Sequence, residues 1–178
     1  SHAWSRQEEM LTGLSLGAPP DALNAQGQNW GLTGFSPRAL GPDLRPWRDL
    51  LEATLRHVGG IRVDHVLGLA RRWVIPAGAA PTEGAYLAYP FDALLGELAA
   101  AAHARDALVV GEDLGTVPPG FRARLRAAGV LGTDVLQFAR DDAHWIAPEC
   151  WNADAAAYTS THDLPPLAGW WSGTDIVL

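Results

Sequence analysis

The chain has 178 residues, 48% hydrophobic and 19% charged, which is typical of a globular domain with a sizeable core. Its formal net charge of -7 argues against a nucleic-acid partner, and the absence of a long apolar run argues against a membrane partner. Cys150 is the only cysteine, so an intrachain disulfide is excluded and a reducing, cytoplasmic location is expected.

Residues 1–43 are interpreted as a loop region beside the site. Residues 17–31 are polar and rich in glycine and proline, which predicts a loop. This loop carries Asp21, Gln28 and Trp30, a set of hydrogen-bonding groups with one flat aromatic ring. It is either a plain surface loop or a binding loop. The eight tryptophans of the chain favour sugar binding, because sugar rings lay their C–H faces on aromatic faces.

Residues 44–178 are predicted to alternate between strands and helices. The pattern favours a parallel α/β sheet, either open and doubly wound or part of a barrel. We treat residues 1–178 as one partial barrel domain. Apolar periodicity predicts helices at 44–55, 91–104 and 121–128, and strands at 58–66, 107–112, 133–138 and 156–160. A further apolar stretch ends at residues 73–76.

Residues 60–66 place two charges in a strand that a parallel sheet would bury. Strand alternation puts Arg62 and Asp64 on one face and His65 on the other. Such charges are costly unless they are paired or functional.

Three predicted strands end in acids: Asp64, Glu112 with Asp113, and Asp163 after His162. The carboxyl ends of parallel strands share one rim, so these acids are expected to meet. Arg62 would keep Asp64 ionised, whereas the apolar run before Glu112 would favour its protonated form. Two such carboxyl groups suit a glycosidase or transglycosidase.

A metal site is the competing use of three acids and a histidine. Against it, Arg62 would repel a cation, and no HxH or HExxH spacing is present. We therefore expect neither a metal nor a cofactor.

The ordered set Ile-Arg-Val-Asp-His (61–65), Val-Gly-Glu-Asp-Leu-Gly (110–115) and Thr-His-Asp (161–163) resembles the signature regions of the α-amylase clan. Residues 17–31, 73–76 and 135–138 are similar to the amylomaltase (4-α-glucanotransferase) family, and residues 164–171 resemble its bacterial maltose-utilisation branch. The resemblance covers residues 17–171. It implies a (β/α)8 barrel and a retaining enzyme that moves α-1,4-glucan segments between maltodextrins.

By this resemblance, three acids would be catalytic: Asp64 as the nucleophile, Glu112 as the acid/base and Asp163 as a ligand of the reacting glucose. Six further residues would bind or orient the substrate, namely Arg62, His65, His162, Gln28, Trp30 and Asp21.

The family's barrel is far longer than this chain, whose motifs match strands four to seven and the loop before strand four. The resemblance thus implies an internal fragment, with barrel edges through which it could self-associate. Two alternatives stay open: an α-glucan hydrolase or debranching relative, and a fragment that binds glucan without turning it over.

Overall fold

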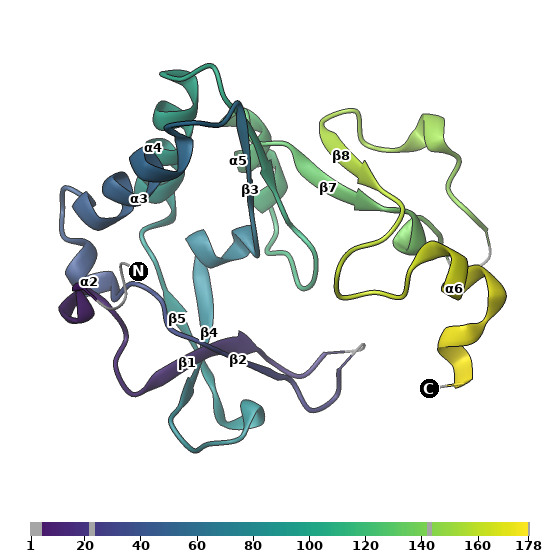
Figure 1. The fold of residues 1–178 in the computed structure, drawn as a ribbon, viewed down its shortest axis with the longest axis horizontal. Coiled ribbons are helices and arrows are strands. Elements are labelled where there is room, and N and C mark those ends of the chain that lie inside the picture. The colour runs from purple at the N-terminus through teal and green to yellow at the C-terminus, as the bar shows by residue number, and fades with distance from the viewer. Residues whose placement is uncertain (1–4, 22–23, 142–143, 178) are drawn as a thin grey trace. The chain divides into compact units, whose positions relative to one another are not determined.

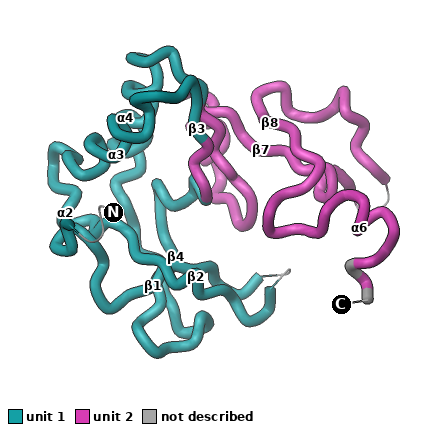
Figure 2. The backbone as a smooth tube through the Cα atoms, in the orientation of Figure 1, with its two compact units in different colours: residues 1–61, 65–108 teal, residues 62–64, 109–178 magenta. Residues whose placement is uncertain are grey.

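The computed structural model describes residues 5–21, 24–141 and 144–177, and the chain divides into two compact units. Unit 1 comprises residues 1–61 and 65–108, and unit 2 comprises residues 62–64 and 109–178 (Figure 2). The short segment 62–64 therefore belongs with the C-terminal part of the chain, which is where two predicted site residues, Arg62 and Asp64, are found.

Unit 1 contains a four-stranded antiparallel sheet with the strand order β2-β1-β4-β5 (Figure 1). Its strands are β1 (Leu14–Ala18), β2 (Gln28–Leu32), β4 (Arg71–Pro76) and β5 (Ala85–Ala88). The prediction of a loop over residues 17–31 was wrong at both ends, because β1 and β2 occupy them. β2 is mostly exposed, so it has no apolar pattern, and pairing with β1 rather than burial makes it a strand.

Gly17 allows β1 and β2 to come close together. A Cβ atom at this position would overlap the carbonyl oxygen of Gln28 and lie 2.8 Å from the Ile75 side chain. The register between the two strands shifts between Leu16 and Gly17. A glycine here therefore positions the strand that carries Gln28 and Trp30.

Two helices of unit 1 pack together, α3 (Arg45–Leu55) and α4 (Phe91–His103), close to the predicted bounds. Their apolar faces bury Leu51, Leu55, Leu94 and Leu98. The indole N–H of Trp47 donates to the carbonyl of Leu94 at 3.1 Å. The remaining helical elements of unit 1 are short: η1 (Gln7–Glu9), α2 (Pro37–Leu40), η2 (Val66–Leu69) and η3 (Pro81–Glu83).

The other strands form two pairs, β3 (Gly60–Val63) with β6 (Leu108–Gly111) and β7 (Gly132–Val135) with β8 (Ala155–Tyr158). β7 and β8 are parallel, as predicted, and α5 (Phe121–Ala127) precedes β7. The other helical elements of unit 2 are η4 (Leu136–Phe138), η5 (Pro148–Cys150), α6 (Leu167–Ser172) and η6 (Thr174–Val177).

The strand predicted over residues 58–66 is shorter than expected. β3 ends at Val63, because His65 has a left-handed backbone (φ 44°) and η2 begins at Val66. The strand alternation that placed His65 opposite Asp64 therefore does not apply to it. Residues 71–88 also depart from the predicted alternation, since β4 and β5 pair antiparallel with each other.

Among the helices of the described residues, none is both long enough and apolar enough to cross a membrane.

Candidate active site

One arginine contacts two of the predicted catalytic carboxylates in unit 2. Arg62 lies on β3, Asp64 follows that strand, and Glu112 follows β6. Arg62 Nη1 donates to Asp64 Oδ1 at 2.5 Å, and Nη2 lies 3.8 Å from Glu112 Oε2. The backbone N–H of Glu112 donates to the carbonyl of Val63 at 2.9 Å. The ends of β3 and β6 thus bring these carboxylates to one guanidinium.

The two carboxylates differ in exposure. The side chain of Asp64 is 69% exposed and that of Glu112 is 16% exposed. This is the asymmetry that the sequence led us to expect. One guanidinium therefore contacts a carboxyl group that is open to solvent and another that is mostly covered.

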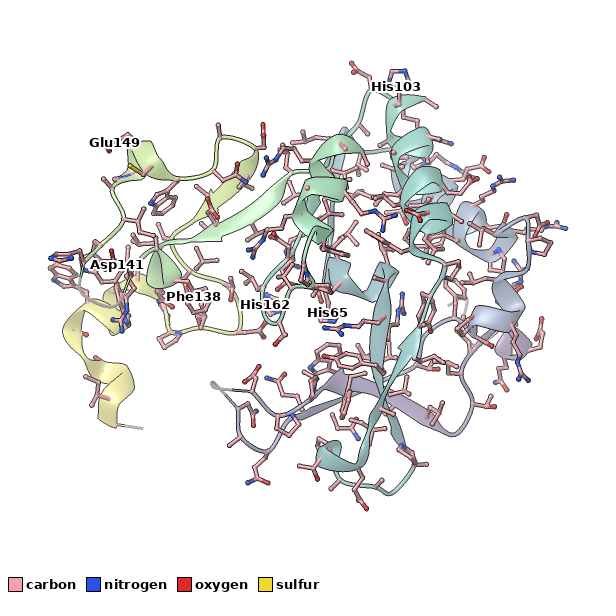
Figure 3. The ribbon with its side chains drawn as sticks, turned by 180° about the vertical axis from the view of Figure 1, so that it is seen from behind. His65, His103, Phe138, Asp141, Glu149 and His162 are labelled. Carbon is pink, nitrogen blue, oxygen red and sulfur yellow. The ribbon has the colours of Figure 1, made fainter. Side chains whose placement is uncertain are left out.

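Asp163 and His162 lie in the turn that follows β8 (Figure 3). His162 Nε2 is 3.3 Å from Asp163 Oδ2, and both side chains are largely exposed. The backbone N–H of Leu164 donates to the carbonyl of Thr161, which closes the turn. Gln137 Nε2 donates to the carbonyl of Pro165 at 3.0 Å and ties the turn to η4.

The other predicted binding residues belong to unit 1. The Trp30 indole N–H donates to Gln28 Oε1 at 2.9 Å, and the Trp30 ring meets the His65 ring edge to face, with centroids 5.2 Å apart. Trp30, Gln28 and His65 therefore form one cluster. Asp21 Oδ1 instead accepts the backbone N–H of Asn24 at 2.7 Å, which is a loop-closing contact.

A partly buried arginine contacts the 3-10 segment that follows His65. Arg72 Nε donates to the carbonyl of Gly68 in η2 at 3.0 Å, and its guanidinium lies 4.9 Å from the centre of the Tyr89 ring. Burial lowers the pKa of Arg72 and raises the pKa of the Tyr89 phenol. The Tyr89 hydroxyl donates to the carbonyl of Phe35 at 2.6 Å. Arg72 therefore contacts the carbonyl of the residue whose N–H donates to the carbonyl of His65.

Asp113 and Arg122 are residues to which the sequence assigned no role. Asp113 is 3% exposed and its Oδ2 accepts Arg122 Nε at 2.6 Å. The signal available was weak: an acid after a buried strand, with an arginine nine residues later on the next helix. This spacing in sequence does not predict the contact, because the folded turn between Asp113 and Arg122 sets the distance between them.

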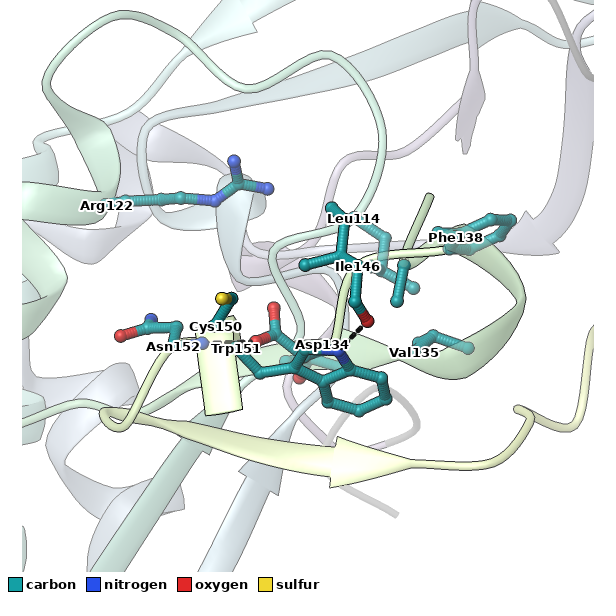
Figure 4. A pocket seen from close by; sticks show the side chains of 11 residues that line it. Leu114, Arg122, Asp134, Val135, Phe138, Ile146, Cys150, Trp151 and Asn152 are labelled. Atoms are coloured by element: carbon teal, nitrogen blue, oxygen red, sulfur yellow. Dashed lines mark hydrogen bonds between the residues drawn. The ribbon is translucent and has the colours of Figure 1, made fainter. Parts of the chain in front are cut away.

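A cavity of about 320 Å³ lies beside β7 in unit 2 (Figure 4). The Trp151 indole N–H donates to the carbonyl of Ile146 at 3.0 Å, and the backbone N–H of Asn152 donates to Asp134 Oδ2 at the same distance. The sequence did not predict this cavity. Its lining residues are Leu114, Arg122, Thr133, Asp134, Val135, Phe138, Ala139, Ile146, Cys150, Trp151 and Asn152.

In the part of the chain that the structure describes, no group of three histidine, cysteine or acidic side chains could hold a metal ion.

Comparison with known proteins identifies similar sequences and structures. The family described as 4-alpha-glucanotransferase matches residues 1–175. A 4-alpha-glucanotransferase of Mycobacterium tuberculosis (strain ATCC 25618 / H37Rv) is 43% identical over 182 residues, which cover 99% of this chain and 25% of that protein. The corresponding protein of Haemophilus influenzae is 38% identical over 98% of this chain and 25% of its own length.

The crystal structure of amylomaltase from Corynebacterium glutamicum superimposes with a TM-score of 0.91 at 40% identity. The match covers 99% of this chain and 25% of that structure. The predicted fold class, part of a (β/α)8 barrel, is thereby confirmed. This chain spans about a quarter of the length of each of these three relatives.

Proposed function

Because this chain belongs to the 4-alpha-glucanotransferase family, we propose that the protein carrying it transfers α-1,4-glucan segments between maltodextrins. The reaction is proposed to pass through a covalent glucosyl-enzyme with retention at the anomeric carbon. The observation that carries this proposal is the contact of Arg62 with both Asp64 and Glu112.

In the first half-reaction, an Asp64 oxygen attacks the anomeric carbon of the donor. The bond from this carbon to the leaving glucan oxygen breaks as Glu112 gives its proton to that oxygen. Arg62 holds the attacking carboxylate through its 2.5 Å contact. The products are a shortened glucan and a glucosyl ester of Asp64.

In the second half-reaction, Glu112 takes the proton of the acceptor's hydroxyl group. That oxygen attacks the anomeric carbon, and the ester bond to Asp64 breaks. Glu112 ends protonated and Asp64 ends ionised, so the site is restored without a cofactor or metal. Asp163 and His162 hydrogen-bond the reacting glucose and strengthen this contact as the ring flattens.

Residues of unit 1 are proposed to bind sugar and to favour a sugar acceptor over water. The Trp30 ring offers an apolar face to a glucose ring of the substrate. Gln28 and His65 hold the Trp30 ring through their contacts in the cluster. Asp21 is proposed to contact the substrate from its turn. Glucan hydrolysis is the competing reaction, and the Trp30 cluster is the feature that favours transfer.

Incubation of the full-length protein with maltotriose tests the reaction. Transfer gives glucose together with a ladder of longer dextrins, whereas hydrolysis gives only maltose and glucose. Asp64→Asn and Glu112→Gln should each lower turnover by about 10²–10⁴-fold while dextrin binding is retained.

Asp154→Asn is the matched control, because Asp154 is an exposed acid of the same unit that pairs with Arg126. Undiminished turnover in Asp64→Asn or Glu112→Gln would defeat the catalytic assignment. The alternative of a chain that binds glucan without turnover is tested with residues 1–178 alone: dextrin binding without products would support it.

The binding partner is proposed to be an α-1,4-glucan, and the protein is proposed to work in the cytoplasm. Residues 1–178 are also proposed to self-associate through strand edges. The free thiol of Cys150 supports a reducing compartment. Sedimentation of residues 1–178 at several concentrations tests self-association, and a concentration-independent monomer would reject it.

A further inference from the structure

Asp113 is a carboxylate buried directly beside the proposed acid/base Glu112. Its Oδ2 accepts Arg122 Nε at 2.6 Å, and its Oδ1 accepts the backbone N–H of Thr133 at 2.9 Å. Arg122 also donates through Nη2 to the backbone carbonyl of Asp113 at 3.0 Å. One side chain thus joins the end of β6 to both α5 and β7.

These contacts complete the fixation of the backbone around Glu112. The N–H of Gly111 donates to the carbonyl of Leu131 at 2.8 Å, and the N–H of Glu112 donates to that of Val63 at 2.9 Å. After Asp113 the chain has no helix or strand until α5 begins at Phe121. Asp113 therefore anchors the chain directly on the C-terminal side of Glu112.

Burial of a carboxylate is a costly way to hold a strand end. The ion pair of Asp113 with Arg122 is buried on one side only, because the side chain of Asp113 is 4% exposed and that of Arg122 is 57% exposed. Such a pair does, however, specify one geometry, because the two nitrogens of Arg122 meet the side chain and the carbonyl of the same residue. Arg126, on the same helix, makes only an exposed contact to Asp154 at 3.4 Å.

We propose that Asp113 and Arg122 are positioning residues for Glu112, and that their contact holds the Glu112 carboxyl group where it can exchange a proton with the glycosidic oxygen. This inference rests on the proposed acid/base role of Glu112. A misplacement of about 1 Å is enough to lower a rate by about 10²-fold.

The test compares two reactions of the full-length protein, and only one needs proton transfer. Turnover of maltotriose needs Glu112 as acid and base. With α-maltotriosyl fluoride as donor and azide as acceptor, fluoride leaves unprotonated and azide attacks without losing a proton, so neither step needs Glu112. Asp64 is needed for both reactions, since the glucosyl ester forms in each.

Arg122→Ala is the main variant, because the Arg122 side chain is 57% exposed and its loss empties no core position. We expect maltotriose turnover to fall about 10–100-fold with little change in KM, and fluoride–azide turnover to fall by no more than about threefold. Asp113→Asn should show the same selectivity. Arg126→Ala, the matched control on α5, should leave both reactions unchanged.

Equal losses in both reactions, or no loss on maltotriose, would overturn the inference. If Arg122→Ala does not fold, Arg122→Lys carries the same comparison, because lysine keeps the charge and loses the two-pronged contact. Glu112→Gln separates this failure from failure of the proposed function. Selective loss in Glu112→Gln without selectivity in Arg122→Ala rejects only the positioning role, whereas equal losses in Glu112→Gln reject the acid/base assignment itself.

Discussion

Each of the two units is stabilised internally by a different balance of contacts. Most of the buried apolar side chains belong to unit 1, where α3 and α4 pack together and Ile75 of β4 is fully buried. In unit 2 the described buried apolar residues are Val109, Phe121, Leu125, Val130 and Val135. Two buried polar residues, Asp113 and Thr133, hydrogen-bond to each other there.

Unit 2 also exposes large apolar side chains. A hollow of about 520 Å³ is lined by Leu136, Trp145, Leu167, Ala168, Trp170 and Trp171, and Trp171 is 86% exposed. The three proposed catalytic acids all belong to this unit. The proposed chemistry is thus carried by the unit with fewer buried apolar residues, in which the buried hydrogen bond between Asp113 and Thr133 fixes the geometry beside Glu112.

The largest effect on stability is expected from Leu98→Ala in unit 1. Leu98 on α4 is fully buried, so its truncation removes apolar contacts and leaves a cavity, which should lower the free energy of unfolding by about 2–5 kcal/mol. Urea denaturation of the full-length protein measures the change. Leu50→Ala on α3 is the control, because Leu50 is 37% exposed and should cost about 1 kcal/mol or less. If both variants lowered the free energy of unfolding equally, unit 1 would not owe its stability to close packing of its buried side chains.

A smaller effect is expected from Arg122→Ala in unit 2. Asp113 stays buried but keeps only the Thr133 amide among its side chain's described hydrogen bonds, at a cost of about 1–3 kcal/mol. Hydrogen exchange should show the change locally, with faster exchange of the Thr133 amide and unchanged protection in α4. If the amides of α4 exchanged faster to the same extent, the contact of Arg122 would not be a local support of unit 2.

The smallest effect is expected from Arg48→Ala, which removes an exposed ion pair between α3 and α4. Arg48 contacts Glu97 through Nε at 2.7 Å and Nη2 at 2.5 Å. Such pairs contribute little, so the Tm should fall by no more than about 2 °C near neutral pH.

The stabilising contribution of the ion pair between Arg48 and Glu97 should depend on pH. Its hydrogen bond lowers the pKa of Glu97, so the contribution is present above the ordinary carboxyl pKa and is lost as the pH falls through the lowered pKa. The Tm difference between Arg48→Ala and the unmodified protein should therefore vanish in acid. A difference that persists there would assign the effect to packing of the arginine stem instead.

Much of the fold could be predicted because its signals are local. Helices α3 and α4 carry apolar residues at helical spacing, and the strand that ends at Glu112 is a short apolar run. Arg62 and Asp64 are two residues apart, so their contact could be expected from the sequence, although Asp64 lies just beyond the end of β3. By contrast, β2 is polar and exposed, and no periodicity distinguishes it from a loop.

The positions of α3, α4 and α5, the family and the residues proposed for catalysis could be recognised in the sequence, because each signal comes from residues close together in the chain. Three features depend on the folded structure: one guanidinium contacts both Asp64 and Glu112, His65 leaves the strand in a left-handed turn, and Asp113 is held between α5 and β7. These features join residues whose separation in sequence carries no information until the backbone between them has folded.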